Sequence, residues 1–255
     1  MEFAGKVVFV TGATSGIGRR TALKFAENKT SVVAVGRNSQ ALADAENAIK
    51  SCGGQPLTIA ADVTDETAMK KAVAQTIERF GRLDVLINAA GHISNGTIEN
   101  TALTAWDEMM SVNLRAVFHL MQLATPHLIA AKGNIVNVSS VTGLRSFPGV
   151  LAYCVSKAGV DQLTRCAALE LASKGVRVNA VNPGVVVTEI HKRGGMDQTA
   201  YTQFLEHSKT THPLGRVGDP SEIADLILFL ASDKARWITG ATYSIDGGRA
   251  LTCAR

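Results

Sequence analysis

Short apolar runs and longer amphipathic segments alternate along nearly the whole chain. The runs are rich in β-branched residues and do not alternate with polar ones, which is typical of strands buried on both faces of a parallel sheet. We predict strands at 6–10, 31–35, 55–62, 83–88, 134–138, 176–181 and 241–245. We predict helices after residue 18 and at 39–51, 66–80, about 104–127, about 152–173 and 220–232. This order predicts an α/β fold, a doubly wound parallel sheet of about seven strands with helices on both faces.

One stretch, at about 188–214, breaks the rhythm. It is polar, contains Gly194 and Gly195, and lacks a clear apolar period. Segments of this length without structure of their own inside compact domains are usually functional lids or disordered. The alternative is a surface excursion that carries short helices.

Length and composition limit the classes of protein to which the chain can belong. A chain of 255 residues suits one well-buried domain over 1–255, and 46% hydrophobic but 5% aromatic content indicates an aliphatic core. The net charge of +4 is spread along the chain, so we expect neither nucleic-acid nor membrane binding. We find no apolar run suited to a membrane span or a signal sequence, and we expect a cytoplasmic protein. The four cysteines show no metal-ligand spacing, so no metal is expected.

A glycine-rich turn follows the first predicted strand directly. Lys6–Val10 runs into Thr11–Gly18, and a helical pattern comes next. Gly12 permits a tight turn, Gly16 lets the backbone approach a phosphate, and Gly18 lets helix and strand pack closely. The free N–H groups at the helix start then face the anion. Strand, turn and helix together predict a dinucleotide site, although the spacing G-x-x-x-G-x-G differs from the commoner G-x-G-x-x-G.

Tyr153 and Lys157 are four residues apart in a predicted helix, so they share one helix face. Ser139 and Ser140 end the predicted strand just upstream. The pKa of a phenol, ordinarily near 10, is too high for acid–base work at neutral pH, and a lysine within about 4–6 Å lowers it. Serine, tyrosine and lysine in this order predict a site for proton transfer.

The glycine spacing and the serine, tyrosine and lysine together resemble the short-chain dehydrogenase/reductase family. The resemblance runs from about Lys6 to Gly248. It rests on ordered motifs, namely Thr11–Gly18, Asn88–Gly91, Asn113, Ser140, Tyr153, Lys157, Asn182–Gly184, Thr188 and Asp246–Gly248. It implies a Rossmann-type sheet, hydride transfer between a nicotinamide and a carbonyl or secondary alcohol, and a substrate lid at about 188–214.

The resemblance also implies roles for four residues. Tyr153 would be the acid in reduction and the base in oxidation, and Lys157 would hold the nicotinamide ribose besides lowering the pKa of the phenol. Ser140, thirteen residues before the tyrosine, would donate a hydrogen bond to the substrate oxygen. Asn113 would position a water that relays protons to Lys157. The alternative role of Asn113 is structural, as a residue that kinks the helix.

The end of the second predicted strand indicates which nicotinamide cofactor binds. It reads Gly36-Arg37-Asn38 and has no carboxylate for the ribose of NAD, whereas Arg37 suits the 2′-phosphate of NADP and Asn38 can add a donor. We therefore predict NADP(H), with NAD(H) as the alternative, because Ser15 stands where some relatives carry a basic residue. Asn88 could chiefly join two strands, and Asp62 could be a turn residue. The implied cofactor contacts are Gly12, Thr14, Ser15, Gly16, Ile17, Gly18, Arg37, Asn38, Asp62, Val63, Asn88, Ala89, Gly91, Tyr153, Lys157, Pro183, Gly184, Val186 and Thr188.

The sequence alone does not identify the substrate. The general resemblance is to 3-oxoacyl-acyl-carrier-protein reductases, which implies an acidic carrier as partner, bound by Lys132 and Lys174 near the site entrance. Steroids, sugars and small ketones are alternative substrates. An NAD-dependent dehydrogenase of the same family and a non-catalytic NADP(H) sensor or scaffold are alternative functions. The substrate pocket is predicted at His92, Ser94, Leu144, Phe147, Val185 and Ile190.

Two predicted helices, at about 104–127 and 152–173, carry more apolar residues than one sheet face can cover. A monomer would expose part of this surface, which soluble chains normally avoid. We therefore predict a homotetramer of dihedral symmetry, with a dimer as the alternative. The sheet could instead absorb all of these side chains. They are Met109, Met110, Val117, Leu120, Met121, Val160, Leu163, Ala167 and Leu171.

Overall fold

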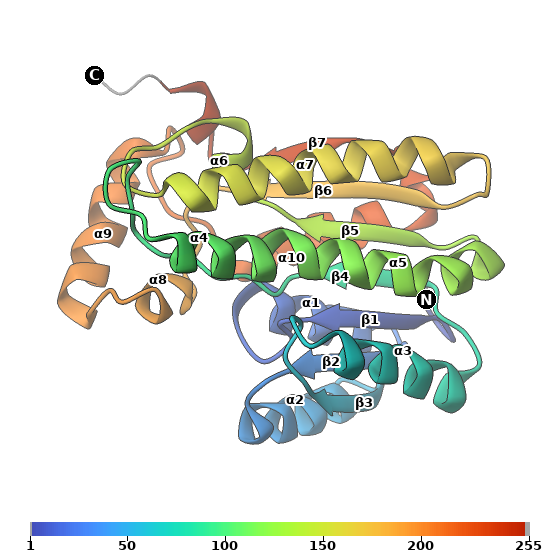
Figure 1. Ribbon diagram of the computed structural model, residues 1–255. Coiled ribbons are helices and arrows are strands. Elements are labelled where there is room, and N and C mark those ends of the chain that lie inside the picture. The colour runs from blue at the N-terminus through green and yellow to red at the C-terminus, as the bar shows by residue number, and fades with distance from the viewer. Residues whose placement is uncertain (1, 253–255) are drawn as a thin grey trace.

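The computed structural model describes residues 2–252 and contains one parallel sheet of seven strands (Figure 1). The strands lie in the order β3-β2-β1-β4-β5-β6-β7. From β1 the chain winds to one edge of the sheet and then, from β4 onward, to the other, which confirms the predicted doubly wound α/β fold. The strands are β1 Val7–Thr11, β2 Ser31–Gly36, β3 Gln55–Ala60, β4 Val85–Asn88, β5 Asn134–Val138, β6 Arg177–Pro183 and β7 Thr242–Ile245.

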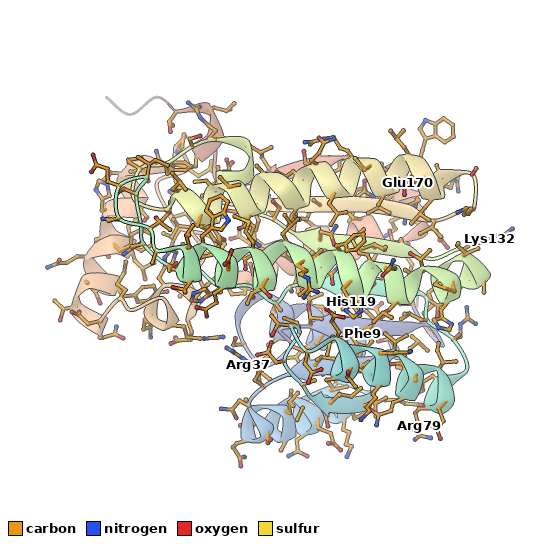
Figure 2. All side chains as sticks on the ribbon, in the orientation of Figure 1. Phe9, Arg37, Arg79, His119, Lys132 and Glu170 are labelled. Atoms are coloured by element: carbon orange, nitrogen blue, oxygen red, sulfur yellow. The ribbon has the colours of Figure 1, made fainter. Side chains whose placement is uncertain are left out.

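Two hydrophobic clusters bury the two faces of the sheet. The flanking helices are α1 Gly16–Ala26, α2 Ser39–Ser51, α3 Glu66–Phe80, α5 Ala116–Ala131, α7 Leu151–Ala172 and α10 Pro220–Ala231. Val8 and Val10 of β1 pack with α1, α2 and α10, whereas Val7 and Phe9 pack with α3, α5 and α7 (Figure 2). Successive side chains of a strand point to opposite faces, so a strand covered on both sides must be apolar throughout. The unbroken apolar runs of the sequence are the result.

Helix ends follow local signals in the sequence. Asp65 precedes α3, and its side chain accepts a hydrogen bond from the N–H of Ala68 at 2.9 Å. Gly81 ends the same helix with a φ of 73°, a conformation that glycine adopts without strain. α10 begins with a capping box between Asp219 and Glu222. These signals are local, and the predicted bounds of both helices agree closely with the structure.

Three features differ from the predicted pattern. The helix predicted at about 104–127 is divided into α4 (Leu103–Met110), a π-helical turn η1 (Ser111–Arg115) and α5. A short helix α6 (Val141–Leu144) follows β5. The polar stretch at 188–214, where the sequence shows no clear period, contains α8 (Ile190–Arg193) and α9 (Gln198–Thr211), and its function as a lid stays a prediction. α9 buries only Tyr201 and Ser208, which explains why no apolar period marks it.

The apolar residues named for pairing between copies are mostly buried within one chain. Met109, Leu120 and Val160, for example, are each at most 2% exposed. The argument for a tetramer from these residues is therefore wrong, because the sheet and its helices already cover them. The apolar side chains that α5 and α7 do expose are Phe118, Val155 and Leu169. The homotetramer stays a prediction.

Two negative findings concern membranes and metals. Within residues 2–252, no helix is both long and apolar enough to cross a membrane. Across the same residues, no three His, Cys, Asp or Glu side chains are grouped so that they could hold a metal ion. The cytoplasmic location stays a prediction.

Candidate active site

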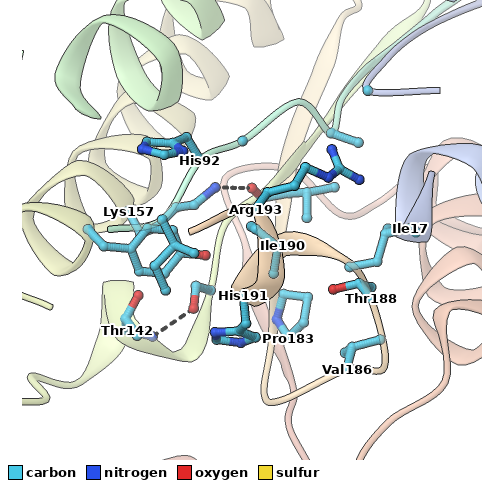
Figure 3. A pocket seen from close by; sticks show the side chains of 18 of the residues that line it. Ile17, His92, Thr142, Lys157, Pro183, Val186, Thr188, Ile190, His191 and Arg193 are labelled. Atoms are coloured by element: carbon cyan, nitrogen blue, oxygen red, sulfur yellow. Dashed lines mark hydrogen bonds between the residues drawn. The ribbon is translucent and has the colours of Figure 1, made fainter. Parts of the chain in front are cut away.

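A cavity of about 690 Å³ opens at the carboxyl edge of the sheet (Figure 3). It lies outside β1 and β4, where the strand order reverses, and doubly wound sheets bind ligands at this position. Residues of α7, α8 and α9 close its other sides. The predicted site residues that line it are Gly12, Thr14, Ser15, Gly16, Ile17, Gly18, Arg37, Asp62, Val63, Ala89, Gly91, His92, Ser140, Phe147, Tyr153, Lys157, Pro183, Gly184, Val185, Val186, Thr188 and Ile190.

The glycines of the glycine-rich turn have no room for a side chain. Gly12 and Gly16 have φ values of 66° and 52°, in the left-handed region. A Cβ atom on Gly12 would lie 2.8 Å from the carbonyl oxygen of Ala89, and one on Gly18 would lie 2.4 Å from the carbonyl oxygen of Gly12. α1 begins at Gly16, and no side chain of residues 2–252 caps its first turn. The first N–H groups of the helix are therefore available to an anion in the cavity, as a dinucleotide pyrophosphate requires.

Asn88 joins two strands rather than lining the cavity. It is buried, and its Nδ2 donates to Oδ1 of Asn137 on β5 at 2.8 Å. The neighbouring loop is held by Thr11, whose Oγ1 accepts from the N–H groups of Ala89 and Ala90 at 3.1 Å each. The structure thus supports the strand-joining alternative for Asn88, while Ala89 lies at the cavity.

Arg37 lies at the end of β2, at the rim of the cavity. Its Nη1 is 3.4 Å from Oδ2 of Asp62, and its side chain is 75% exposed. Burial acts to raise the pKa of Asp62, but hydrogen bonds from Thr64 and the charge of Arg37 lower that pKa overall. Asn38 does not line the cavity, because its Oδ1 accepts from the N–H of Ala41 and caps α2. Arg37 is therefore the positively charged side chain at the end of β2 that lines the cavity.

Ser140 follows β5 and starts α6. Its Oγ accepts a hydrogen bond from the N–H of Thr142 at 3.1 Å, and its side chain also hydrogen-bonds with that of Tyr153 at the cavity. The neighbouring Ser139 is committed elsewhere, since its Oγ donates to the carbonyl of Lys157 at 3.1 Å. This difference favours Ser140 over Ser139 as the donor to a ligand, as the sequence predicts.

Tyr153 and Lys157 lie on the buried face of α7. Burial raises the pKa of Tyr153 to about 12, and a hydrogen bond with the Ser140 side chain acts in the opposite direction. Burial lowers the pKa of Lys157 to about 8, against the charge of Asp161. The Nζ of Lys157 donates to the carbonyl of Val138 at 2.8 Å and lies 5.7 Å from the centre of the Tyr153 ring (Figure 3). The sequence-based expectation of a lowered phenol pKa is reversed, because desolvation outweighs the hydrogen bond with Ser140.

Asn113 lies in the π-helical turn η1 and is fully buried. Its Oδ1 accepts from the N–H of His92 and its Nδ2 donates to the carbonyl of His92, both at 2.8 Å. The same Nδ2 is 3.1 Å from Oγ of Ser156 on α7. Asn113 does not line the cavity, and it fixes the loop after β4 against α7. Its part in a water relay stays a prediction.

Comparison with known proteins identifies the family. Residues 12–250 match the family model described as enoyl-(acyl carrier protein) reductase. The 3-oxoacyl-acyl-carrier-protein reductase of Thermotoga maritima is 38% identical over 97% of this chain and 99% of its own. The 2,5-dichloro-2,5-cyclohexadiene-1,4-diol dehydrogenase LinX of Sphingobium indicum is 39% identical over 97% of both chains. A solved short-chain dehydrogenase/reductase of unknown function from Caenorhabditis elegans, crystallised with cofactor, is 36% identical, with a TM-score of 0.95 over 100% of this chain and 98% of its own.

The chain belongs to the short-chain dehydrogenase/reductase family. It is therefore an oxidoreductase of a family that binds a nicotinamide cofactor. The residues at the cavity fit that group, because Gly12 and Gly18 let the turn, the helix and the loop after β4 approach closely and the first turn of α1 is uncapped within the described chain. The fit rests on backbone atoms, which do not discriminate between NAD and NADP.

Two of the predicted substrate-pocket residues do not line the cavity, and several residues that the sequence does not predict line it instead. Ser94 and Leu144 are not among the lining residues, and the Leu144 side chain is 40% exposed. The cavity instead receives side chains from the 188–214 segment and from the chain after β7. His191 packs against Phe204 with ring centres 4.5 Å apart, and burial lowers the pKa of this histidine. The additional lining residues from these two segments are His191, Arg193, Phe204, His207, Ser208, Thr211 and Arg249.

Buried hydrogen bonds hold the 188–214 segment together and join it to the chain after β6. The phenol of Tyr201 donates to the carbonyl of Thr188 at 2.8 Å. Nε2 of His212 accepts from the N–H of Val185 at 3.1 Å, while Nδ1 lies 2.7 Å from the carbonyl of Ser208. These partners are 13 to 27 residues apart in a region of no apolar period, so no sequence signal could have indicated them.

Proposed function

We propose that this enzyme is an NADP(H)-dependent carbonyl reductase or alcohol dehydrogenase in which Tyr153 and Ser140 act on the substrate oxygen. The observation that carries the proposal is that the Tyr153 phenol, the Ser140 hydroxyl and the glycine-rich turn all open into the same cavity. Such a cavity brings together a proton donor, a hydrogen-bond donor and a dinucleotide site, as carbonyl reduction requires.

Proton transfer follows from the burial of Tyr153. The nicotinamide, when bound, supplies or accepts the hydride. Burial keeps the pKa of Tyr153 at about 12, so the phenol carries its proton at neutral pH and can act as the acid in reduction. The Ser140 hydroxyl accepts from Thr142 and hydrogen-bonds with the Tyr153 side chain, and when a substrate is bound its proton can be donated to the oxygen on which negative charge develops.

Lys157 contributes a positive charge beside the phenol. Its donation to the Val138 carbonyl uses one of its three N–H bonds, which leaves two for other partners. We assign these two to the nicotinamide ribose, as the family resemblance implies. The ammonium also stabilises the phenolate that Tyr153 becomes after it has given up its proton. Because the pKa of Lys157 is about 8, this stabilisation weakens at alkaline pH.

Arg37 carries the preference for NADP(H). The end of β2 offers no carboxylate to a ribose 2′-hydroxyl, and the exposed guanidinium of Arg37 suits a 2′-phosphate. Asp62 competes for the same guanidinium at 3.4 Å, so we expect the preference to be moderate. Arg37→Asp removes the phosphate partner and adds a ribose partner, and it should reverse the preference.

The substrate class that we propose is a carbonyl compound that includes 3-oxoacyl thioesters, on the strength of the 38% identity to a 3-oxoacyl-acyl-carrier-protein reductase. The lysines predicted to bind a carrier protein do not support this part. Lys132 ends α5 just before β5, and Lys174 lies just before β6, so within one chain both lie at the amino edge of the sheet (Figure 2). The cavity lies at the opposite, carboxyl edge. A thioester without its carrier is therefore the first substrate to test.

The experiment is a panel of carbonyl compounds and secondary alcohols with NADPH, NADH and their oxidised forms. The panel contains 3-oxoacyl thioesters, cyclic ketones and steroids. We expect turnover that is faster with NADPH than with NADH and is lost in Tyr153→Phe. Faster turnover with NADH would overturn the cofactor assignment. Tight NADPH binding without turnover of any compound would favour a non-catalytic sensor instead.

A further inference from the structure

Arg193 connects the 188–214 segment to the glycine-rich turn. It is the last residue of α8, and its Nη2 donates to Oγ of Ser15, 178 residues earlier in the chain. Both residues line the cavity. Figure 3 shows the guanidinium reaching from α8 to the side of the cavity where Ile17 lies in the first turn of α1. A cation thus lies at the phosphate-binding turn, although the turn itself contains no basic residue.

The first turn of α1 and the guanidinium of Arg193 are neighbours, and both carry positive charge. Ser15 occupies the N-cap position of α1, but its side chain accepts no hydrogen bond from the helix and is turned to Arg193. The start of a helix carries a partial positive charge. Among residues 2–252, no carboxylate lies within ion-pairing distance of Arg193. An anion between the two would neutralise both, and a phosphate has the oxygens to accept from both.

The adjacent Lys192 provides the contrast. Its Nζ forms an ion pair with Glu189 at 2.9 Å and lies 5.1 Å from the centre of the Tyr201 ring. Lys192 does not line the cavity. Two neighbouring cations of one short helix therefore have different surroundings. One is neutralised within its own segment, and the other is directed at the glycine-rich turn.

We propose that Arg193 binds a phosphate of the nicotinamide dinucleotide, and that this contact fastens the 188–214 segment over the cavity. The inference rests on the cofactor site of the family and is independent of the proton-transfer roles assigned to Ser140 and Tyr153. The phosphate is either the pyrophosphate, shared by NAD and NADP, or the 2′-phosphate of NADP. In either case Arg193 supplies, from a distant segment, the charge that Ser15 does not.

A consequence is that cofactor binding prepares the substrate end of the cavity. Ile190 and His191 lie on the same helical turn as Arg193 and line the cavity. When Arg193 is held by a phosphate, these two side chains are held as well. We therefore expect the substrate to bind tightly only after the dinucleotide has bound.

The test is calorimetric titration of NADP⁺ and NAD⁺ into the wild-type enzyme, Arg193→Gln, Arg193→Lys and the matched control Lys192→Gln. Arg193 is exposed, so its variants should fold normally. We expect Arg193→Gln to weaken binding by roughly 10- to 100-fold, as is typical for a charge-assisted hydrogen bond to phosphate. Arg193→Lys should recover part of the loss, and Lys192→Gln should change affinity by less than about twofold.

The two dinucleotides separate the candidate phosphates. An equal loss for NADP⁺ and NAD⁺ assigns Arg193 to the pyrophosphate, and a loss confined to NADP⁺ assigns it to the 2′-phosphate. Unchanged affinity for both would overturn the inference while leaving the proposed reaction intact. If neither dinucleotide binds the wild-type enzyme, the cofactor assignment itself fails.

A second readout examines the fastening of the segment without any turnover. Amide hydrogen exchange of α9 should slow when NADP⁺ is added to the wild-type enzyme and to Lys192→Gln. At saturating NADP⁺, Arg193→Gln should show little of this protection. Equal protection in all three proteins would contradict the coupling between phosphate and segment.

Discussion

The two ends of the cavity are built by opposite means. At the proposed cofactor end the functional groups are backbone atoms, brought into position because Gly12, Gly16 and Gly18 let neighbouring segments approach closely. At the catalytic end they are polar side chains buried in the core, with Tyr153 8% and Lys157 4% exposed. The first end depends on close approach of the backbone and the second on removal of water. A substitution at the first end should therefore weaken dinucleotide binding, and one at the second end should slow proton transfer.

The catalytic end carries a cost in stability that the cofactor end does not. Lys157 is kept away from water, and its pKa of about 8 measures how strongly the fold disfavours its charge. Asp161, one helical turn further along α7, is also buried, and its Oδ1 has no hydrogen-bond partner among the described residues. Its Oδ2 accepts from Nδ2 of Asn182, which also donates to the carbonyl of Ser140, at 2.9 Å each. These groups hold Ser140 and Lys157 in place, although burying them is itself unfavourable.

Lys157→Met should have the largest effect and should separate activity from stability. Turnover should fall by roughly 100- to 10,000-fold, the range for loss of acid–base assistance. At pH 7 the variant should be more stable to urea by about 3 kcal/mol, because the buried charge is removed. The shift of the lysine pKa from 10.5 to about 8 sets this size.

The direction in which the stability difference between wild type and Lys157→Met changes with pH tests whether desolvation of Lys157 causes it. At pH 7 both folded and unfolded wild-type chains carry the Lys157 proton, so the full penalty of burial applies. Between pH 8 and 10.5 the folded chain loses the proton first, so the wild type gains stability relative to the variant and the difference shrinks. Lys50→Met, on the exposed side of α2, should change stability by less than about 0.5 kcal/mol. A difference that does not change with pH would refute the role of desolvation.

Gly18→Ala should damage the cofactor end with a smaller effect. The added Cβ would lie 2.4 Å from the Gly12 carbonyl oxygen, so α1 must move away from the turn. We expect dinucleotide affinity to fall about 100-fold because the first N–H groups of the helix move too, with a loss of about 1–3 kcal/mol in stability. Gly81→Ala is the control, since its Cβ would meet nothing within 4 Å and only the positive φ is strained. Dinucleotide affinity reduced equally in both variants would contradict the steric explanation.

Asp161→Asn should have the smallest effect, confined to the pH profile. The charge of Asp161 raises the pKa of Lys157, so its removal should lower that pKa further. The amide keeps an oxygen for Asn182, and the geometry near Ser140 should survive. The alkaline decline of kcat for carbonyl reduction should therefore move to lower pH. A decline that stays in place or moves to higher pH would show that Lys157 does not control it.

The sequence predicts the cofactor end better than the catalytic end. The β-branched strand, the three glycines and the helix that follows lie within twenty residues, and their physical roles are local. The pairing of Tyr153 with Lys157 is also local, because helical spacing places both on one face. Burial is not local, and the direction of the Tyr153 pKa is wrong in the sequence-based account for that reason.

Contacts between distant segments could not be predicted. Asp161 meets Asn182 across 21 residues, and Arg193 meets Ser15 across 178. Asn113 looks like a helix residue with a catalytic or kinking role, and only the folded chain reveals that it fixes the loop at His92. The 188–214 segment has no apolar stripe because it packs over a cavity and buries few residues, so its helices leave no pattern.

The central claim is that binding and proton transfer belong to different ends of the cavity, and one variant tests it most directly. Tyr153→Phe deletes a single oxygen, keeps the ring in the core and leaves the glycine-rich turn unchanged. The measurement is the NADPH dissociation constant and the rate of carbonyl reduction on the same preparation. We predict a dissociation constant within about twofold of the wild type and a rate lower by roughly 100- to 10,000-fold. A rate within about tenfold of the wild type, with NADPH still bound, would contradict the account.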